Sequence, residues 1–359
     1  MALLTSLLLM SLSSLPITHS LLSSSTSLSY RTAPFRKIQP IGTLPKRTTS
    51  CIVEYSPSHY QDYFLFHAHI PKTGGTSFAQ CFTRYWDVSR TEGVIQDVAT
   101  NCRSWKPNSN QSHLKYLSCE VYANGDLTYV TSILNNPPYS TKTLIMITMI
   151  RHPLNYIFSA FGHHALRRKK ACQNFNAIIT ADLNPNSSSA SCTHYDIRNL
   201  QTRALSSSDR ESFEPYTFGP ANLTQALSVL RNEMFFVGIT RYYRASMCLF
   251  AYQLGQLHLH TSVCDCRQLE TASKVIRANK SSNSTLNHRD ILSTDAAEVL
   301  YSQYINLDEL LYNYALDLFL WRIFAAERHV KIKLLCANTD GDAIMFRKQL
   351  MMYDGDGDV

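Results

Sequence analysis

Three short, nearly continuous apolar runs constrain the fold of this chain more than any other feature. They are "YFLFHAHI" (residues 63–70), "TLIMITMI" (143–150) and "MFFVGIT" (234–240), and helix-like stretches separate them. Apolar runs of this length are typical of strands that are covered on both faces. Strands that alternate with helices pair in parallel, and the helices pack on both sides of the sheet. The sequence therefore predicts an α/β fold with a mostly parallel sheet.

A long amphipathic helix is predicted near the C-terminus, over "NLDELLYNYALDLFLWRIFAAERHV" (residues 306–330). Asn306 and Glu309 have the spacing of a capping box at its start. One face of this helix carries apolar side chains at helical spacing, namely Leu307, Leu310, Leu311, Tyr314 and Leu318.

The chain is expected to have three parts. Residues 1–55 are predicted to be a targeting segment or signal-anchor plus stem, 56–335 the folded domain, and 336–359 a flexible tail. The N-terminus "MALLTSLLLMSLSSLPITHSLL" is apolar, which fits a secretory signal or an N-terminal membrane anchor. The acid-free, Ser/Thr-rich stretch after it also fits a chloroplast transit peptide.

Sequons and cysteines favour the secretory pathway. The ten cysteines include no zinc-type pair, which is typical of disulfides in an oxidising lumen. Cys172 and Cys192 bracket a polar loop and are predicted to pair. Cys264 and Cys266 are too close together for zinc geometry and are expected in other disulfides. Five Asn-x-Ser/Thr sequons lie in polar surroundings, at Asn110, Asn186, Asn222, Asn279 and Asn283.

The net charge of +7 does not indicate a nucleic-acid partner, because of where the charge lies. Residues 1–53 contain five basic and no acidic side chains. Removing these five from the 34 Lys and Arg leaves 29 basic against 27 acidic residues. The folded part is therefore nearly neutral, and nucleic acid is not expected as a partner.

The first apolar run leads into "PKTGGTS", which has the pattern of an anion-binding loop. A strand, a glycine-containing loop and a helix N-terminus bring backbone N–H groups together, and the helix dipole favours negative charge. Gly74 and Gly75 allow the backbone to approach an oxyanion, and Lys72 supplies a cation. Hydroxyl donors come from Thr73, Thr76 and Ser77.

This loop does not fit an ATP-splitting enzyme. A Walker A loop places its lysine after the glycines, whereas Lys72 precedes them. The run 143–150 also leads into Arg151 instead of the acidic residue that would hold magnesium. In "RHPLNYIFSAF", Pro153 suits the first turn of a helix, and Ser159 lies about two turns along it. Arg151 and Ser159 therefore suit a second phosphate on the same nucleotide.

Together, "PKTGGTSF" and "RHPLNYIFSAF" resemble the two phosphosulfate-binding motifs of sulfotransferases that use 3′-phosphoadenylyl sulfate (PAPS). "HIPKTGGTSF" is most similar to the membrane-bound polysaccharide branch, notably the heparan sulfate 6-O- and 2-O-sulfotransferases. "NEMFFVGITRYYRASMCLFAYQLG" and "INLDELLYNYALDLFLWR" also resemble segments of the 6-O enzymes in order and spacing. The resemblance implies a P-loop-like, three-layer α/β/α sandwich.

The resemblance also implies an activity, namely transfer of sulfuryl from PAPS to a hydroxyl of a glycan or polysaccharide in the Golgi. The first loop would hold the 5′-phosphosulfate, and Arg151 with Ser159 would hold the 3′-phosphate. Lys72 would neutralise the bridging oxygen as PAP, the desulfated donor, leaves. The scheme requires no metal.

The base that takes the acceptor proton is where the sequence departs from these relatives. They carry a His between the two motifs, where this chain has "HLKYLSCEVYANGDL". Glu120 is the first candidate, because other sulfotransferases use Glu. His113 is the second, and Tyr122, a poor base at its ordinary pKa, is the third.

Further contacts are carried over from the same resemblance. "NLQTRAL" resembles an acceptor-side stretch, so Gln201 and Arg203 are expected to contact the substrate. "NSTLNHRD" resembles a late cofactor loop, so Thr285 and Arg289 are expected near PAPS. The motifs leave the acceptor open, and a tyrosylprotein sulfotransferase or an inactive PAP- or glycan-binding homologue are the alternatives.

Overall fold

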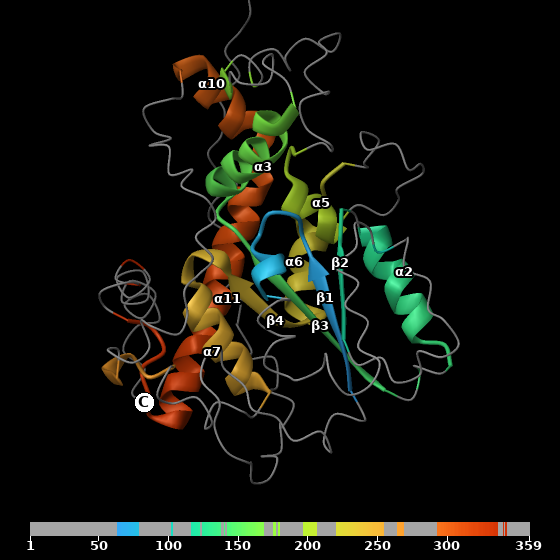
Figure 1. Ribbon diagram of the computed structural model, residues 1–359, viewed down its shortest axis with the longest axis vertical. Helices are drawn as coiled ribbons and strands as arrows, with labels where there is room; N and C mark the ends of the chain where they lie inside the picture. Colours follow the sequence, from blue (N-terminus) through green and yellow to red (C-terminus); the bar gives the residue numbers. More distant parts are fainter. Residues whose placement is uncertain are drawn as a thin grey trace, which may run out of the picture. The chain divides into compact units, whose positions relative to one another are not determined.

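A four-stranded, fully parallel sheet forms the centre of the described structure (Figure 1). The computed structural model describes residues 63–78, 102, 116–122, 124–137, 140, 142–168, 175–176, 179, 197–206, 220–254, 264–268, 293–336, 340 and 342. The strand order is β2 (Tyr116–Glu120), β1 (Tyr63–His69), β3 (Thr143–Ile150) and β4 (Met234–Ile239). The described residues all lie in one compact unit, Pro40–Val359. The predicted targeting segment, residues 1–55, lies outside the described residues.

Strands β1, β3 and β4 are the three predicted apolar runs. Residues 64–70 are all buried, and six consecutive residues of β3 are buried. A strand with both faces buried must be apolar in nearly every position, which is why these runs do not alternate. The predicted α/β fold with a parallel sheet is therefore confirmed.

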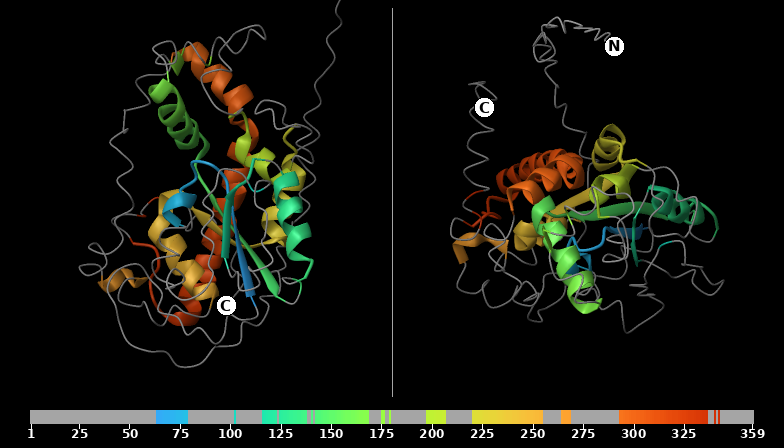
Figure 2. Two further views of the ribbon diagram at one scale, coloured as in Figure 1. Left: turned by 45° about the vertical axis from the view of Figure 1, so that its right-hand side comes forward. Right: turned by 90° about the horizontal axis from the view of Figure 1, so that it is seen from above.

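The helices lie on both faces of this sheet. Figure 2, seen from above, shows α6 and α11 on one side and residues 75–78 on the other. On the second side, the rings of Phe78, Phe236 and Phe250 pack together, with centroids 4.9–6.1 Å apart. The three-layer arrangement thus agrees with the α/β/α sandwich expected. The helices are α2 (Asn124–Leu134), α3 (Pro153–Arg168), α5 (Leu200–Ser206), α6 (Leu223–Asn232), α7 (Tyr243–Gln253), α10 (Thr294–Val299) and α11 (Asn306–Val330).

Helix α11 covers the predicted range, but the structure corrects how it begins. Its first turn has no cap from its own side chains, so the predicted capping box of Asn306 and Glu309 is wrong. Instead the Asn199 side-chain oxygen accepts hydrogen bonds from the N–H groups of Leu307 (2.9 Å) and Asp308 (3.1 Å). The start of α11 is therefore capped by a residue more than a hundred positions earlier in the chain.

The capping is reciprocal. The Asp308 carboxylate, on α11, accepts hydrogen bonds from the N–H groups of Gln201 (3.2 Å) and Thr202 (2.7 Å) at the start of α5. It also accepts one from the Thr202 hydroxyl (2.7 Å). Two helix N-termini are thus joined, each capped by a side chain from the other segment, and α5 is held against α11.

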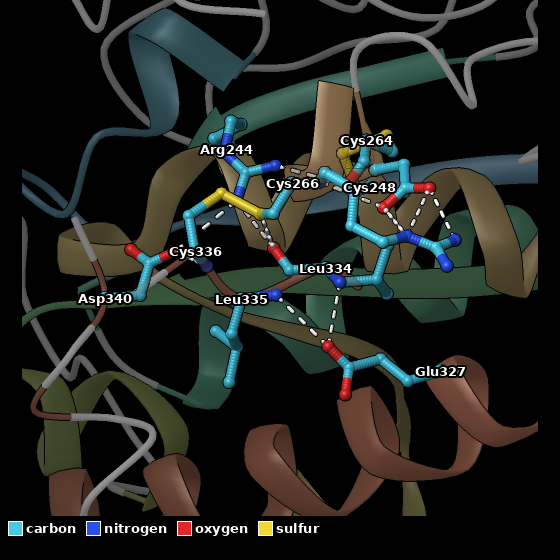
Figure 3. A network of polar contacts seen from close by, with 11 residues as sticks. Arg244, Cys248, Cys264, Cys266, Glu327, Leu334, Leu335, Cys336 and Asp340 are labelled. Carbon is cyan, nitrogen blue, oxygen red and sulfur yellow. Dashed lines mark hydrogen bonds and ion pairs between the residues drawn. A yellow bond between two sulfur atoms is a disulfide. The ribbon is translucent and has the colours of Figure 1, made fainter. Parts of the chain in front are cut away.

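Disulfides fix the segment that follows α11 (Figure 3). Cys266 bonds to Cys336, and Cys248 bonds to Cys264. The prediction of disulfides for Cys264 and Cys266 is confirmed, whereas the predicted pair of Cys172 and Cys192 lies outside the described residues. Cys336, the first residue of the predicted tail, is thereby attached to the domain.

The disulfides agree with an oxidising, secretory-type compartment. A third bond joins Cys102 to Cys119 on β2. None of the helices in the described ranges has the length and apolar content needed to cross a membrane.

Candidate functional site

The strand order places a topological switch point at the carboxyl ends of β1 and β3. The chain moves from β1 outward to β2, returns across β1 to β3, and continues outward to β4. Connections therefore leave β1 and β3 in opposite directions, which is the topological switch point where open α/β sheets bind ligands. The two predicted anion-binding motifs follow these two strands directly.

The β1 loop (residues 70–77) turns sharply into a helix. The Thr73 hydroxyl and N–H both donate to the Ile70 carbonyl, at 2.7 and 3.3 Å. The Phe78 N–H donates to the Gly74 carbonyl (3.1 Å), which closes the first helical turn. The N–H groups of the residues before Phe78 belong to the start of a helix, where they lack helical acceptors and favour an anion.

Both glycines of the β1 loop are required by its geometry. Gly74 has φ +93°, a backbone conformation that side chains rarely adopt. At Gly75 a Cβ atom would lie 2.0 Å from Cδ2 of His69, so the ring of the last β1 residue leaves no room for one. The loop can take this path only with glycine at both positions.

Lys72 also has a left-handed backbone, with φ 63°. For a residue other than glycine this conformation costs about 1–3 kcal/mol, so other contacts must stabilise it. The Arg151 Nη1 atom donates a hydrogen bond to the Lys72 carbonyl over 2.9 Å. The first residue after β3 thus fixes the lysine of the β1 loop.

Arg151 has the features of an anion-binding cation. It is half-buried, and burial lowers the pKa of its guanidinium. Within the described ranges no carboxylate forms an ion pair with it. A buried charge is expensive unless it is paired, so this guanidinium is best satisfied by an anionic ligand.

The backbone of Arg151 is fixed by Gln201 on α5. The Gln201 side-chain oxygen accepts from the Arg151 N–H (2.9 Å), and its NH₂ group donates to the Arg151 carbonyl (2.8 Å). Gln201 is fully buried, and Arg203 is only 5% exposed. The structure therefore places Gln201 beside the switch point, and the contact of Gln201 and Arg203 with an acceptor stays a prediction.

Thr240 is a residue of this site that the sequence analysis missed. It follows β4, and its hydroxyl contacts the carbonyls of Thr73 and Ile150, the latter over 3.1 Å. Its methyl group lies 3.2 Å from where a Cβ on Gly74 would be. Thr240 thus joins the β1 loop to the end of β3. The one available signal was its place at the end of the third apolar run.

Glu120 lies at the carboxyl end of β2, opposite His69 in the β1–β2 register. Burial raises the pKa of its carboxyl group, while a hydrogen bond from Tyr122 and the charge of Lys72 lower it. The Tyr122 hydroxyl donates to the Glu120 carboxylate. His69, the register partner of Glu120, is the last residue of β1, and the β1 loop that carries Lys72 follows it directly.

Asp126, on α2, fixes the turn that carries this pair. It is fully buried, and its carboxylate accepts from the Tyr122 N–H over 2.9 Å. From the sequence, Glu120 and Tyr122 were alternative candidates for the base, and strand β2 was not predicted. In the structure the two side chains form one hydrogen-bonded pair.

The two histidines of β1 are buried in the core. His67 Nδ1 lies 3.0 Å from the Ser118 hydroxyl, and its ring stacks on His69 at 5.6 Å. Burial lowers the pKa of His69 to about 4 and holds that of His67 well below its ordinary value. Both rings are therefore neutral near pH 7.

The remaining predicted site residues are spread around this centre. Thr73 is buried, Thr76 is exposed, and Ser77 and Ser159 are half-buried, with Ser159 on α3. Helix α3 begins at Pro153 as predicted. His113, Thr285 and Arg289 lie outside the described residues. Nor do the described residues include a group of three or more His, Cys, Asp or Glu side chains that could hold a metal ion.

The fold is that of a parallel α/β protein, with Lys72, Arg151 and Glu120 at or just beyond the carboxyl ends of three adjacent strands. No protein-family model matches the chain, and no curated protein is significantly similar to it in sequence. The function is therefore inferred from the motifs and from the geometry of the site.

Proposed function

We propose that the protein is a PAPS-dependent sulfotransferase that transfers sulfuryl to a hydroxyl of a glycan or polysaccharide and releases PAP. One observation carries the proposal: Lys72, Arg151 and Glu120 follow or end three adjacent parallel strands, β1, β3 and β2. Two cations suit a donor with anionic groups at both ends, and the carboxylate suits a base. The two motifs that resemble the sulfotransferase family contain both cations.

The donor is assigned to the two cationic positions. The β1 loop takes the 5′-phosphosulfate on its backbone N–H groups, with Lys72 beside the bridging oxygen. Arg151, which has no carboxylate partner in the described part of the chain, takes the 3′-phosphate together with Ser159. Thr285 and Arg289 are proposed as further donor contacts by resemblance.

In the proposed reaction, Glu120 acts as the base. The acceptor oxygen forms a bond to sulfur, the bond from sulfur to the bridging oxygen breaks, and Lys72 neutralises the charge left on PAP. Glu120 accepts the proton of the acceptor hydroxyl. Burial raises the pKa of Glu120, which makes it a better base than an exposed carboxylate. Proton transfer of this kind contributes about 10²–10⁴-fold to a rate.

The cellular compartment is proposed from the disulfides and from the proposed reaction. Disulfides suit an oxidising compartment, and sulfation of glycans suits the Golgi. The N-terminal segment then serves as a signal or membrane anchor, with chloroplast import as the alternative.

The test is transfer from radiolabelled PAPS to a panel of desulfated polysaccharides and acidic tyrosine peptides. We expect label on a polysaccharide, a loss of about 10²–10⁴-fold in kcat for Glu120→Gln, and a loss of turnover for Lys72→Ala. Tyr301→Phe, at an exposed residue of the turn Leu300–Tyr304, serves as the matched control.

Each other outcome favours a different function. Label on peptides alone would identify a tyrosylprotein sulfotransferase. Binding of PAP without transfer, unchanged by Glu120→Ala, would identify an inactive homologue. Thermal stabilisation by Mg-ATP at least equal to that by PAP would overturn the proposal in favour of a nucleotide kinase or NTPase.

A further inference from the structure

The side-chain amide of Gln201 pairs with the Arg151 backbone as a neighbouring strand would. Strand β3 ends at Ile150, and Arg151 is the next residue. Its N–H and carbonyl are both bonded to one carboxamide, at 2.9 and 2.8 Å. A carboxamide carries an acceptor oxygen and a donor NH₂ group side by side. It can therefore satisfy the N–H and the carbonyl of Arg151 together.

The backbone of Gln201 is itself held in place. The residue is fully buried on α5, and its backbone N–H donates to the Asp308 carboxylate (3.2 Å). Asp308 is fully buried as well and accepts two further bonds from Thr202, each of 2.7 Å. The backbone of the residue whose amide contacts Arg151 is thus anchored to the long helix α11.

The Arg151 guanidinium is consequently restrained at both ends. Gln201 fixes its backbone, and the bond to the Lys72 carbonyl uses one of the five N–H donors of the guanidinium. An arginine that is free to rotate loses about 2 kcal/mol of rotamer entropy on binding a ligand. A prepositioned guanidinium avoids most of this loss and can meet a phosphate with two parallel hydrogen bonds.

We propose that Gln201 is a positioning residue that sets the preference of this site for nucleotides carrying a 3′-phosphate. This inference rests on the proposed function, because it assigns the 3′-phosphate to Arg151. Gln201 acts through Arg151 and does not touch the nucleotide. It therefore strengthens the interaction with one phosphate and leaves the 5′ end of the nucleotide to the β1 loop.

The test compares two nucleotides that differ by one phosphate, PAP and adenosine 5′-monophosphate, by isothermal titration. The variant Gln201→Met keeps the length of the side chain and removes both bonds to Arg151. We expect the PAP/AMP affinity ratio to fall about tenfold in this variant, with a much smaller change in AMP affinity. Damage to the whole fold would lower both affinities together.

Two further variants keep the test decisive. Gln253→Met alters another buried glutamine, whose amide donates to the Phe235 carbonyl (3.3 Å), and should keep the wild-type ratio. Thr202→Val removes one bond to Asp308 and should lower the ratio by a smaller factor, which tests the inference if Gln201→Met does not fold.

The possible results separate the two proposals. A wild-type protein that binds PAP no better than AMP would overturn the proposed function and this inference with it. A wild-type preference for PAP that both Gln201→Met and Thr202→Val retain would overturn the inference alone.

Discussion

The Tyr122 hydroxyl donates a hydrogen bond to the Glu120 carboxylate at the carboxyl end of β2. This bond stabilises the ionised form of Glu120 and so lowers its pKa, against the larger effect of burial, which raises it. The two residues therefore act as one unit, in which the phenol orients the carboxylate and adjusts its affinity for a proton.

The variant Tyr122→Phe tests this coupling through the pH dependence of the rate. Without the hydroxyl the pKa of Glu120 rises further, and the ionised base appears only at higher pH. We expect the acidic limb of the kcat profile to move to higher pH, while the rate at high pH falls much less than in Glu120→Gln. Tyr301→Phe should leave the profile in place. An unmoved acidic limb in Tyr122→Phe would show that Glu120 is not the titrating base.

The contact between Gly75 and His69 predicts a steric effect. A Cβ at position 75 would lie 2.0 Å from Cδ2 of His69, so Gly75→Ala must displace the ring or the β1 loop. Overpacking of this kind costs about 1–3 kcal/mol, and we expect that loss in urea unfolding together with weaker PAP binding. In a His69→Ala background the same substitution should cost much less, because the ring is gone. Equal costs in both backgrounds would contradict the prediction.

His69 predicts a loss of stability in acid. Its pKa is about 4 in the folded protein, against an ordinary value of 6.5. Below pH 6.5 the imidazole of His69 becomes protonated in the unfolded chain, whereas in the folded chain it stays neutral down to about pH 4. The contribution of His69 to the free energy of unfolding is therefore complete above pH 6.5 and is lost as the pH drops towards 4.

The variant His69→Phe isolates this effect, because it keeps a ring but cannot be protonated. We expect the stability of the wild type relative to this variant to fall by about 1–3 kcal/mol between neutral pH and the acidic limit. Urea unfolding of both proteins across that range is the measurement. Parallel pH dependences in the two proteins would exclude His69 as the source.

Two arginines near the C-terminal segment form a natural comparison (Figure 3 shows the first). Arg244 donates to the Leu334 carbonyl (2.6 Å) and pairs with Asp340, which is 6% exposed. Arg241 pairs with Asp342 over 2.5 Å, but both of these side chains are about half exposed, at 54% and 45%. The first arginine is thus built into the structure, and the second lies at its surface.

Replacing each arginine by methionine should give different losses of stability. Arg244→Met leaves the Asp340 carboxylate buried without its cation, and we expect a loss of about 3–5 kcal/mol in the free energy of unfolding. Arg241→Met breaks an exposed pair worth less than about 1 kcal/mol. Urea denaturation of both variants is the check, and similar losses would mean that burial does not separate the two pairs.

Part of the candidate site could be predicted from the sequence because it is local. Lys72, Gly74 and Gly75 follow a buried apolar run directly, so strand, turn and helix start can be recognised within a few residues. The same holds for Arg151 at the end of β3 and for Pro153 in the first turn of α3.

Other parts of the site could not be predicted from the sequence. Strand β2 is short and carries Ser118 between apolar residues, so it gives no continuous apolar signal, yet β1 pairs with it along five residues. Without β2 there was no reason to place Glu120 beside the β1 loop. Thr240 likewise gave only the signal of following a strand, and its two carbonyl partners belong to other strand ends.

The three buried strands and the helix α11 could be predicted from the order of apolar and polar residues along the chain. These depend on which neighbours at spacings of one to four residues are apolar, and that pattern is complete in the chain. The long-range partners, such as Asn199 with Asp308 and Gln201 with Arg151, depend instead on the packing of the folded chain. A short polar side chain can bond to any nearby donor or acceptor, and which one comes near depends on how the helices pack.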